Sequence, residues 1–210
     1  DQKNPEYQYE LGSLLLTAGM VDESVPYLFS ASKQMPWHYG THYNLGQALL
    51  HVGKKDEAEI FFSRADSLRD LENLSARLLL RTRANPQDQA GWGNLGNTYR
   101  EMGRLNDANK AYKIALSLGP ADVQLENTVA YLSLLTGDTT GAIFYYEHIL
   151  QQNPSRTDTW FNLGLIQASK GMYGAARKSW ENVLTLDPSD TTAIKFIEAI
   201  PEPNFFELIQ

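Results

Sequence analysis

The histidines and one glycine-rich segment are the residues whose types and spacing could support metal or phosphate chemistry. His38 and His42 are four residues apart, so a helix would place both imidazoles on one face, but no cysteine or matching glutamate pair adds zinc ligands. The segment Gly137–Gly141 lacks the lysine and the preceding strand of a phosphate-binding loop. No Ser/His/Asp or Cys/His arrangement indicates a nucleophile. The sequence therefore predicts no catalytic residue, no metal, no cofactor and no enzymatic activity.

Small residues recur in this chain with a fixed period. Gly12, Gly46, Gly96, Ala130 and Gly164 share one phase of a 34-residue repeat, apart from a step of 50 residues between the second and the third. A period of this size predicts stacked helix pairs, because one pair alone cannot bury its apolar face. The period defines five windows, at residues 5–38, 39–72, 89–122, 123–156 and 157–190.

Glycines and prolines punctuate these windows where helices must turn or end. Proline at the end of each second helix cannot continue it. A glycine between the two halves of each window predicts a turn between the first helix and the second. These turn glycines are Gly19, Gly53, Gly103, Gly137 and Gly171.

The third window carries the most complete motif. It reads Trp92-x2-Leu95-Gly96-x2-Tyr99 and then Ala108-x3-Tyr112-x2-Ala115. This pattern resembles the tetratricopeptide repeat, and weaker copies extend the resemblance over about four-fifths of the chain. The resemblance implies an all-α fold, a right-handed superhelical solenoid of antiparallel helix pairs. It also implies one domain over residues 1–210 whose function is to bind a protein or peptide, with residues 191–210 as a capping helix and tail.

Sixteen extra residues interrupt the period at about residues 71–86. No glycine or proline occurs between Lys54 and Asn85, and apolar residues recur at steps of three and four, which favours one extended or kinked second helix over a separate extra helix. Two interpretations of the insert stay open. It is a tolerated insertion, or it presents an exposed apolar stripe for self-association, which predicts a homodimer. The stripe would consist of Leu74, Leu78 and Leu79.

One face of each first helix carries amides and aromatic rings. Positions two, five, six, nine and twelve of the first helices lie together, away from the core positions. In the family that the chain resembles, this face forms the concave surface and is the usual ligand site. Amides can hold a peptide backbone, while aromatic rings pack its side chains. The candidate peptide-binding residues are Tyr9, Tyr43, Asn44, Gln47, Asn94, Asn97, Arg100, Asn127, Tyr131, Phe161 and Asn162.

These candidates have alternative interpretations. The asparagines resemble the asparagine ladder of some tetratricopeptide proteins, but Glu10 and Thr128 depart from it and the insert interrupts its spacing. Asparagine is also common at this position for local reasons, and the aromatic rings could simply fill space between neighbouring helices. The carboxylate clamp of chaperone-binding members is not expected, because Tyr9 and Ser13, or Tyr43 and Gln47, occupy the places of its lysines.

Composition limits the partners and leaves the compartment open. Lys and Arg number 18 against 25 Asp and Glu, so the net charge of −7 argues against nucleic acid as a partner. No apolar run approaches the roughly 18 residues of a membrane span, so no membrane insertion is expected. The absence of cysteine leaves the localisation undetermined.

Alternative functions also stay open at this stage. The chain begins with Asp1, so we expect a trimmed or processed protein, and a regulatory or substrate-presenting segment of a larger enzyme is one alternative function. A self-assembling scaffold is another. The apolar tail at residues 204–210 is expected to pack on the last repeat, to continue into a further domain or to occupy a groove.

Overall fold

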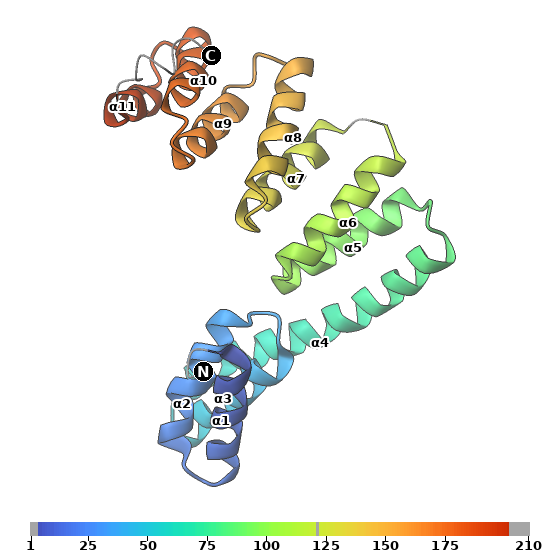
Figure 1. The fold of residues 1–210 in the computed structure, drawn as a ribbon. Coiled ribbons are helices and arrows are strands. Elements are labelled where there is room, and N and C mark those ends of the chain that lie inside the picture. Colours follow the sequence, from blue (N-terminus) through green and yellow to red (C-terminus); the bar gives the residue numbers. More distant parts are fainter. Residues whose placement is uncertain (1–3, 121, 202–210) are drawn as a thin grey trace. The chain divides into compact units, whose positions relative to one another are not determined.

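The computed structural model describes residues 4–120 and 122–201, and all regular elements in these residues are helices (Figure 1). This confirms the all-α fold predicted from the repeat. The expected packing of the tail at residues 204–210 lies outside the described residues. The helices are α1 (Pro5–Thr17), α2 (Val21–Gln34), α3 (Tyr39–His51), α4 (Lys55–Ala84), α5 (Gln89–Met102), α6 (Leu105–Leu118), α7 (Val123–Leu135), α8 (Thr139–Gln152), α9 (Thr157–Ser169), α10 (Tyr173–Leu186) and α11 (Thr191–Ala199).

Glycines form the turn inside each helix pair, as predicted. At the end of α5, Gly103 has φ 89° and adopts the left-handed conformation that a side chain disfavours. The other turn glycines also have positive φ. Aspartates begin several of the helices by accepting hydrogen bonds from first-turn N–H groups, and they are Asp88, Asp122, Asp138 and Asp190.

The small residues of the repeat allow the paired helices to approach closely. A Cβ atom on Gly46 would lie 2.8 Å from the ring of Phe62, and one on Gly164 would lie 2.4 Å from the indole nitrogen of Trp180. The aromatic rings therefore occupy the space that a larger residue on the first helix would need. This packing requirement explains why small residues recur every 34 residues.

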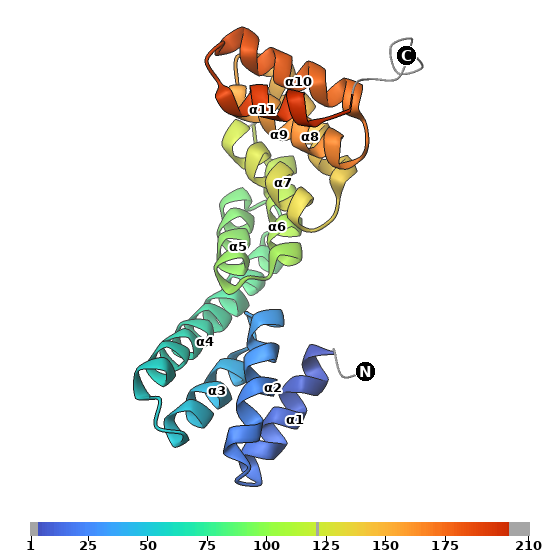
Figure 2. The ribbon, with the colours of Figure 1, turned by 90° about the vertical axis from the view of Figure 1, so that its left-hand side faces the viewer.

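The helices form two compact units, residues 1–111 and 112–210, and the boundary falls inside α6. In unit 1, α1 contacts α2, α2 contacts α3, α3 contacts α4 and α4 contacts α5 (Figure 2). In unit 2, α7 contacts α8, α8 contacts α9, α9 contacts α10, and α10 contacts α11. Each unit has its own buried core, built around Leu28 and Leu45 in unit 1 and around Tyr146 and Trp180 in unit 2.

The insert is part of α4, a single helix of 30 residues, so the extended-helix interpretation is correct. The N-terminal part of α4 packs against α3 through Ala58 and Phe62. Its C-terminal part packs against α5, where Leu78 contacts Leu95. One long helix thus supports two first helices, one after the other along its length.

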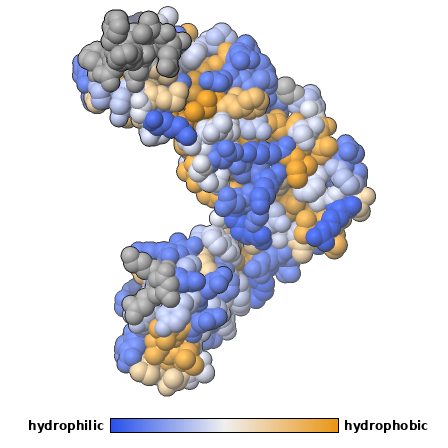
Figure 3. Space-filling view, in the orientation of Figure 1, coloured by the Kyte–Doolittle hydropathy of each residue, from blue (hydrophilic) through white to orange (hydrophobic). Residues whose placement is uncertain are grey.

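The exposed stripe proposed for this insert is not formed. Leu78 is 9% exposed and belongs to the core with Leu95, and Leu79 packs against the same cluster. Leu74 is 36% exposed. The α5 helix covers Leu78 and Leu79, which the sequence suggested were exposed for contact with a second copy of the chain. On the face drawn in Figure 3, hydrophobic areas are small and interspersed with hydrophilic surface.

Candidate functional site

In unit 1, the candidate residues of α1 and α3 lie at the contact between these two helices. Asn44 donates a hydrogen bond from Nδ2 to the Ser13 hydroxyl at 2.9 Å. This amide therefore joins neighbouring first helices. Its carbonyl oxygen retains acceptor capacity, because a carboxamide offers two lone pairs.

The aromatic candidates of unit 1 pack mostly on their own neighbours. Tyr9 meets the ring of His38 edge-on, with centroids 4.5 Å apart, and packs against the core. Tyr43 stacks on Tyr39 at 5.6 Å yet stays 38% exposed, while Gln47 is half-buried. Tyr43 is therefore the most exposed member of this set, whereas Tyr9, Asn44 and Gln47 are half-buried.

The α5 candidates do not continue the surface of α3. Gly46 of α3 faces Phe62, whereas Leu95 of α5 packs with Leu78, sixteen residues further along α4. At a rise of 1.5 Å per residue, this separates the two contact points by about 24 Å along the helix. The row of asparagines expected from α3 into α5 is thus interrupted. Asn94, Asn97 and Arg100 are exposed on α5 as a separate set.

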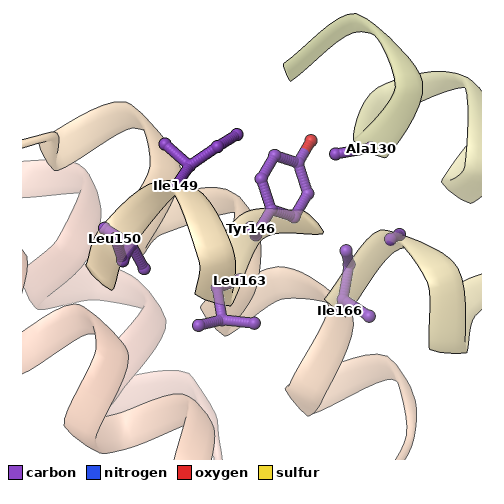
Figure 4. Packing of buried hydrophobic residues seen from close by; sticks show 7 residues of the cluster. Ala130, Tyr146, Ile149, Leu150, Leu163 and Ile166 are labelled. Atoms are coloured by element: carbon purple, nitrogen blue, oxygen red, sulfur yellow. The ribbon is translucent and has the colours of Figure 1, made fainter. Parts of the chain in front are cut away.

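Unit 2 brings its candidates together around one buried phenol. Tyr146 of α8 is 1% exposed and lies in a cluster with Ala130 of α7 and Ile166 of α9 (Figure 4). The side chain of Asn162 lies beside its hydroxyl and acts to lower its pKa. Burial, followed by the nearby Tyr131 and Asp158, raises the pKa of Tyr146 to about 12, so its hydroxyl is protonated at neutral pH.

Tyr131 is the most exposed of the aromatic candidates. Its side chain is 53% exposed on α7, near the buried phenol of Tyr146. Asp158 is paired with Arg156 at 2.7 Å, and this ion pair holds the pKa of the carboxyl below its usual range. An exposed ring beside an amide, a phenol and a neutralised carboxylate can pack an apolar side chain and bond a peptide backbone.

Two other candidates of unit 2 are placed differently from the prediction. Phe161 packs edge-on against Phe196 of the capping helix α11, with centroids 5.4 Å apart, and also contacts the core around Trp180. The capping helix thus covers much of the surface that we expected Phe161 to offer to a ligand. Asn127 is half-buried, and its Oδ1 accepts no hydrogen bond from the residues that the structure describes.

His38 and His42 have structural roles. His42 occupies the place that Trp92 and Trp160 take in later repeats, and all three side chains bond the carbonyl of the proline six residues earlier, at 3.2, 3.0 and 2.9 Å. Burial lowers the pKa of His42. His38 caps α3 by accepting from the Thr41 N–H group. Within the described ranges, no three His, Asp or Glu side chains gather so that they could hold a metal ion.

Sequence reasoning missed Tyr146, Asp158 and Arg64. Tyr146 stands at the aromatic position of the repeat that Tyr112 takes in the third window, which predicts packing alone, and only the fold places its hydroxyl near Tyr131, Asp158 and Asn162. Asp158 lies at position two of its window, where its charge was the available signal. The Arg64 guanidinium donates to the carbonyl oxygens of Pro36, Glu101 and Met102 at 3.1 to 3.3 Å, a contact that depends on the path of α4.

The chain matches two family descriptions. Residues 63–194, more than half of the chain, match the cytochrome c-type biogenesis protein H TPR domain. Residues 39–70 match the tetratricopeptide repeat. Both matches agree with the repeat motifs and with the helix pairs of the structure.

Relatives of known name match parts of longer proteins. The cytochrome c-type biogenesis protein CycH of Pseudomonas aeruginosa is 26% identical over 152 residues, covering 71% of this chain and 37% of that protein. The protein O-mannosyl-transferase TMTC3 of Homo sapiens is 24% identical over 196 residues, covering 92% of this chain and 21% of that protein. The chain therefore spans about a third and a fifth of these relatives.

The fold is shared with a solved structure of MamA. The likeness has a TM-score of 0.51 at 20% identity and covers 70% of this chain and 80% of that chain. At this identity, the likeness supports the tetratricopeptide fold alone.

Among the helices that the structure describes, none is both long and apolar enough to cross a membrane.

Proposed function

Because this chain belongs to the family of the cytochrome c-type biogenesis protein H TPR domain, we propose that it binds a segment of a partner polypeptide on its first helices. The tetratricopeptide fold supports protein–protein interaction in general. The finer proposal names the surface in unit 2 formed by Tyr131, Asp158 and Asn162, which we call the first-helix surface.

One observation carries the proposal. Tyr131 is 53% exposed near the buried Tyr146 phenol, which has the Asn162 amide beside it. An exposed aromatic ring with polar groups beside it is typical of anchoring residues at protein interfaces. The amides and the phenol suit a peptide backbone, and no free charge is needed for that contact.

The family name suggests where to look for the partner. We propose that the partner is a polypeptide of cytochrome c-type biogenesis, as the matching domain and the CycH relative are named for that process. Peptides of about fifteen residues, tiled across c-type cytochrome precursors and assembly proteins, can be titrated against the chain by fluorescence polarisation.

Substitutions on the first-helix surface test the proposal. We expect Tyr131→Ala, or Asn162→Ala, to weaken binding about tenfold or more, equivalent to about 1.4 kcal/mol. Tyr131→Phe separates the ring from the hydroxyl. Lys110→Ala and Glu181→Ala, at exposed positions of α6 and α10, are the controls and should leave affinity unchanged. Loss of binding in the controls, with full affinity in Tyr131→Ala, would contradict the proposal.

A second candidate is the same module acting inside a larger enzyme. The match to 21% of a protein O-mannosyl-transferase favours it, because the chain corresponds to only a part of that protein. The full-length gene product distinguishes the two candidates, since an adjoining catalytic domain would be visible in its sequence.

A further inference from the structure

A groove opens on unit 2 away from the first-helix surface. Its volume is about 440 Å³, and it lies between α8 and α10 with residues of α9 beneath it. Trp160 and Leu163 of α9 and Leu150 of α8 supply its apolar lining. The indole N–H group of Trp160 donates to the Pro154 carbonyl at 2.9 Å, which fixes the ring. We call this hollow the α8–α10 groove, and none of the candidate peptide-binding residues lines it.

At one position of the groove, a small residue stands where the preceding repeat has a large one. Ala175 and Ser179 line it on α10, and the residue 34 positions before Ser179 is Tyr145. The Ser179 hydroxyl turns inward and donates to Gln167 Oε1 at 2.7 Å. Tyr145 instead fills the corresponding place on α8, where the Lys113 ammonium lies 5.9 Å from its ring centroid.

The rim of the groove carries one charge of each sign. Glu147 lies on the α8 side and Lys178 on the α10 side, and both side chains are exposed. Neither forms an ion pair with the residues that the structure describes. By contrast, Lys113 of the preceding repeat is paired with Asp138 at 2.9 Å. The α8–α10 groove therefore combines an apolar floor with two uncompensated, opposite charges.

We propose that the α8–α10 groove is a second docking site, for a segment of a partner protein that presents one large apolar side chain between a basic and an acidic residue. The apolar side chain enters the hollow over Trp160 and loses its contact with water. The basic residue faces Glu147 and the acidic residue faces Lys178, so the rim charges set the direction of the segment. The amides of Gln151 and Asn182, also at the groove, suit the backbone of the segment.

A designed peptide tests this site without knowledge of the natural partner. The probe is fluorescein-labelled Gly-Ser-Arg-Phe-Glu-Ser-Gly, titrated against the full chain by fluorescence polarisation. Matched peptides replace Phe with Ala or exchange the Arg and Glu positions. We expect the probe to bind at least tenfold more tightly than the Ala peptide and several-fold more tightly than the exchanged one. Equal binding of all three, or no binding, would overturn the proposal.

Variants of the chain locate the binding. Ser179→Tyr copies the preceding repeat and should fill the groove, lowering affinity about tenfold. Because that change also removes the bond to Gln167, Lys178→Glu provides an independent test on an exposed residue. It should weaken binding of the probe and favour a further peptide, Gly-Ser-Arg-Phe-Arg-Ser-Gly, whose second Arg faces the new glutamate. An unchanged ranking of peptides would refute the site.

Two controls test where the probe binds and whether the chain's own C-terminal segment occupies the groove. Tyr131→Ala lies on the first-helix surface and should leave probe affinity unchanged, so failure of the proposed function and failure of this site are distinguishable. Deletion of residues 202–210 should also leave it unchanged. If the deletion raised affinity severalfold, the occupant would be the chain's own C-terminal segment and the proposal of a partner segment would be wrong.

Discussion

Unit 1 and unit 2 use the same repeat, but they differ in how a second helix serves its neighbours. In unit 2, α8 has 14 residues, and Tyr146 meets both the preceding and the following first helix. In unit 1, α4 has 30 residues, and its two parts hold α3 and α5 separately. A strict period keeps candidate residues of successive repeats together, whereas an insertion inside a helix moves them apart along its axis.

This comparison changes the meaning of the candidate residues. In unit 2, residues from α7, α8 and α9 share one polar neighbourhood around Tyr146. In unit 1, Asn44 bonds to α1, while Asn94 lies on a helix held further along α4. A ligand that extends over several repeats needs an uninterrupted surface, so unit 2 is the better place to seek it.

The largest expected effect comes from the part of α4 that holds α5. Leu78→Glu should destabilise unit 1 by about 3–5 kcal/mol, because it removes a buried apolar side chain and places a charge in the core. Hydrogen exchange measured by mass spectrometry would show loss of protection in α4 and α5. The matched control is Leu74→Glu, at a position that is 36% exposed, which should change stability by less than about 0.5 kcal/mol.

The Leu74→Glu variant also tests self-association. Light scattering across the micromolar range measures the oligomeric state of the wild type and of Leu74→Glu. If the wild type were a dimer that Leu74→Glu converts to a folded monomer, the insert would take part in self-association through Leu74, although Leu78 is buried against α5.

A smaller effect is expected at Arg64, a residue of α4 whose side chain donates hydrogen bonds to three backbone carbonyls. Arg64→Ala should cost about 1.5–3 kcal/mol, since hydrogen bonds from a charged donor to Pro36, Glu101 and Met102 are lost. The lower stability would be measured by urea unfolding of the chain. It would also appear as faster amide hydrogen exchange at the end of α5. Arg69→Ala, which removes only an exposed ion pair with Asp66, should cost at most about 1 kcal/mol. Equal effects of the two variants would contradict the role given to Arg64.

The smallest effect concerns two aspartates that begin helices, one in each unit. A bond from the Gly91 N–H group, followed by Arg81, lowers the pKa of Asp88, and Lys113, followed by the Gly141 N–H group, lowers that of Asp138. A lowered folded-state pKa gives stability that is present above the unfolded pKa of about 4 and is lost as pH falls through the folded value. We therefore expect a loss of stability below about pH 4.

Asparagine variants measure that contribution. Asp88→Asn and Asp138→Asn retain a capping oxygen but cannot titrate, so each should reduce the loss between pH 5 and pH 3. Added salt should affect the Asp138 contribution more, because its leading cause is the Lys113 ammonium. An unchanged pH profile in both variants would show that other carboxyl groups dominate.

The sequence by itself determined the helix pairs and their turns. Glycine at the turns and at the close contacts, aromatic residues facing those contacts and proline after the second helices are steric requirements that repeat every 34 residues. The absence of glycine and proline from Lys54 to Asn85 likewise predicted the long α4. Such requirements are local, so they can be read from spacing alone.

Only the tertiary structure decided which candidate residues remain available. Leu78 is covered by α5, Phe161 by α11, and Tyr146 reaches a surface that its position in the repeat did not reveal. Each of these outcomes depends on contacts between residues far apart in the chain. The repeat period describes how one helix pair is built, whereas exposure depends on which helix lies against it, and that is set by packing between pairs.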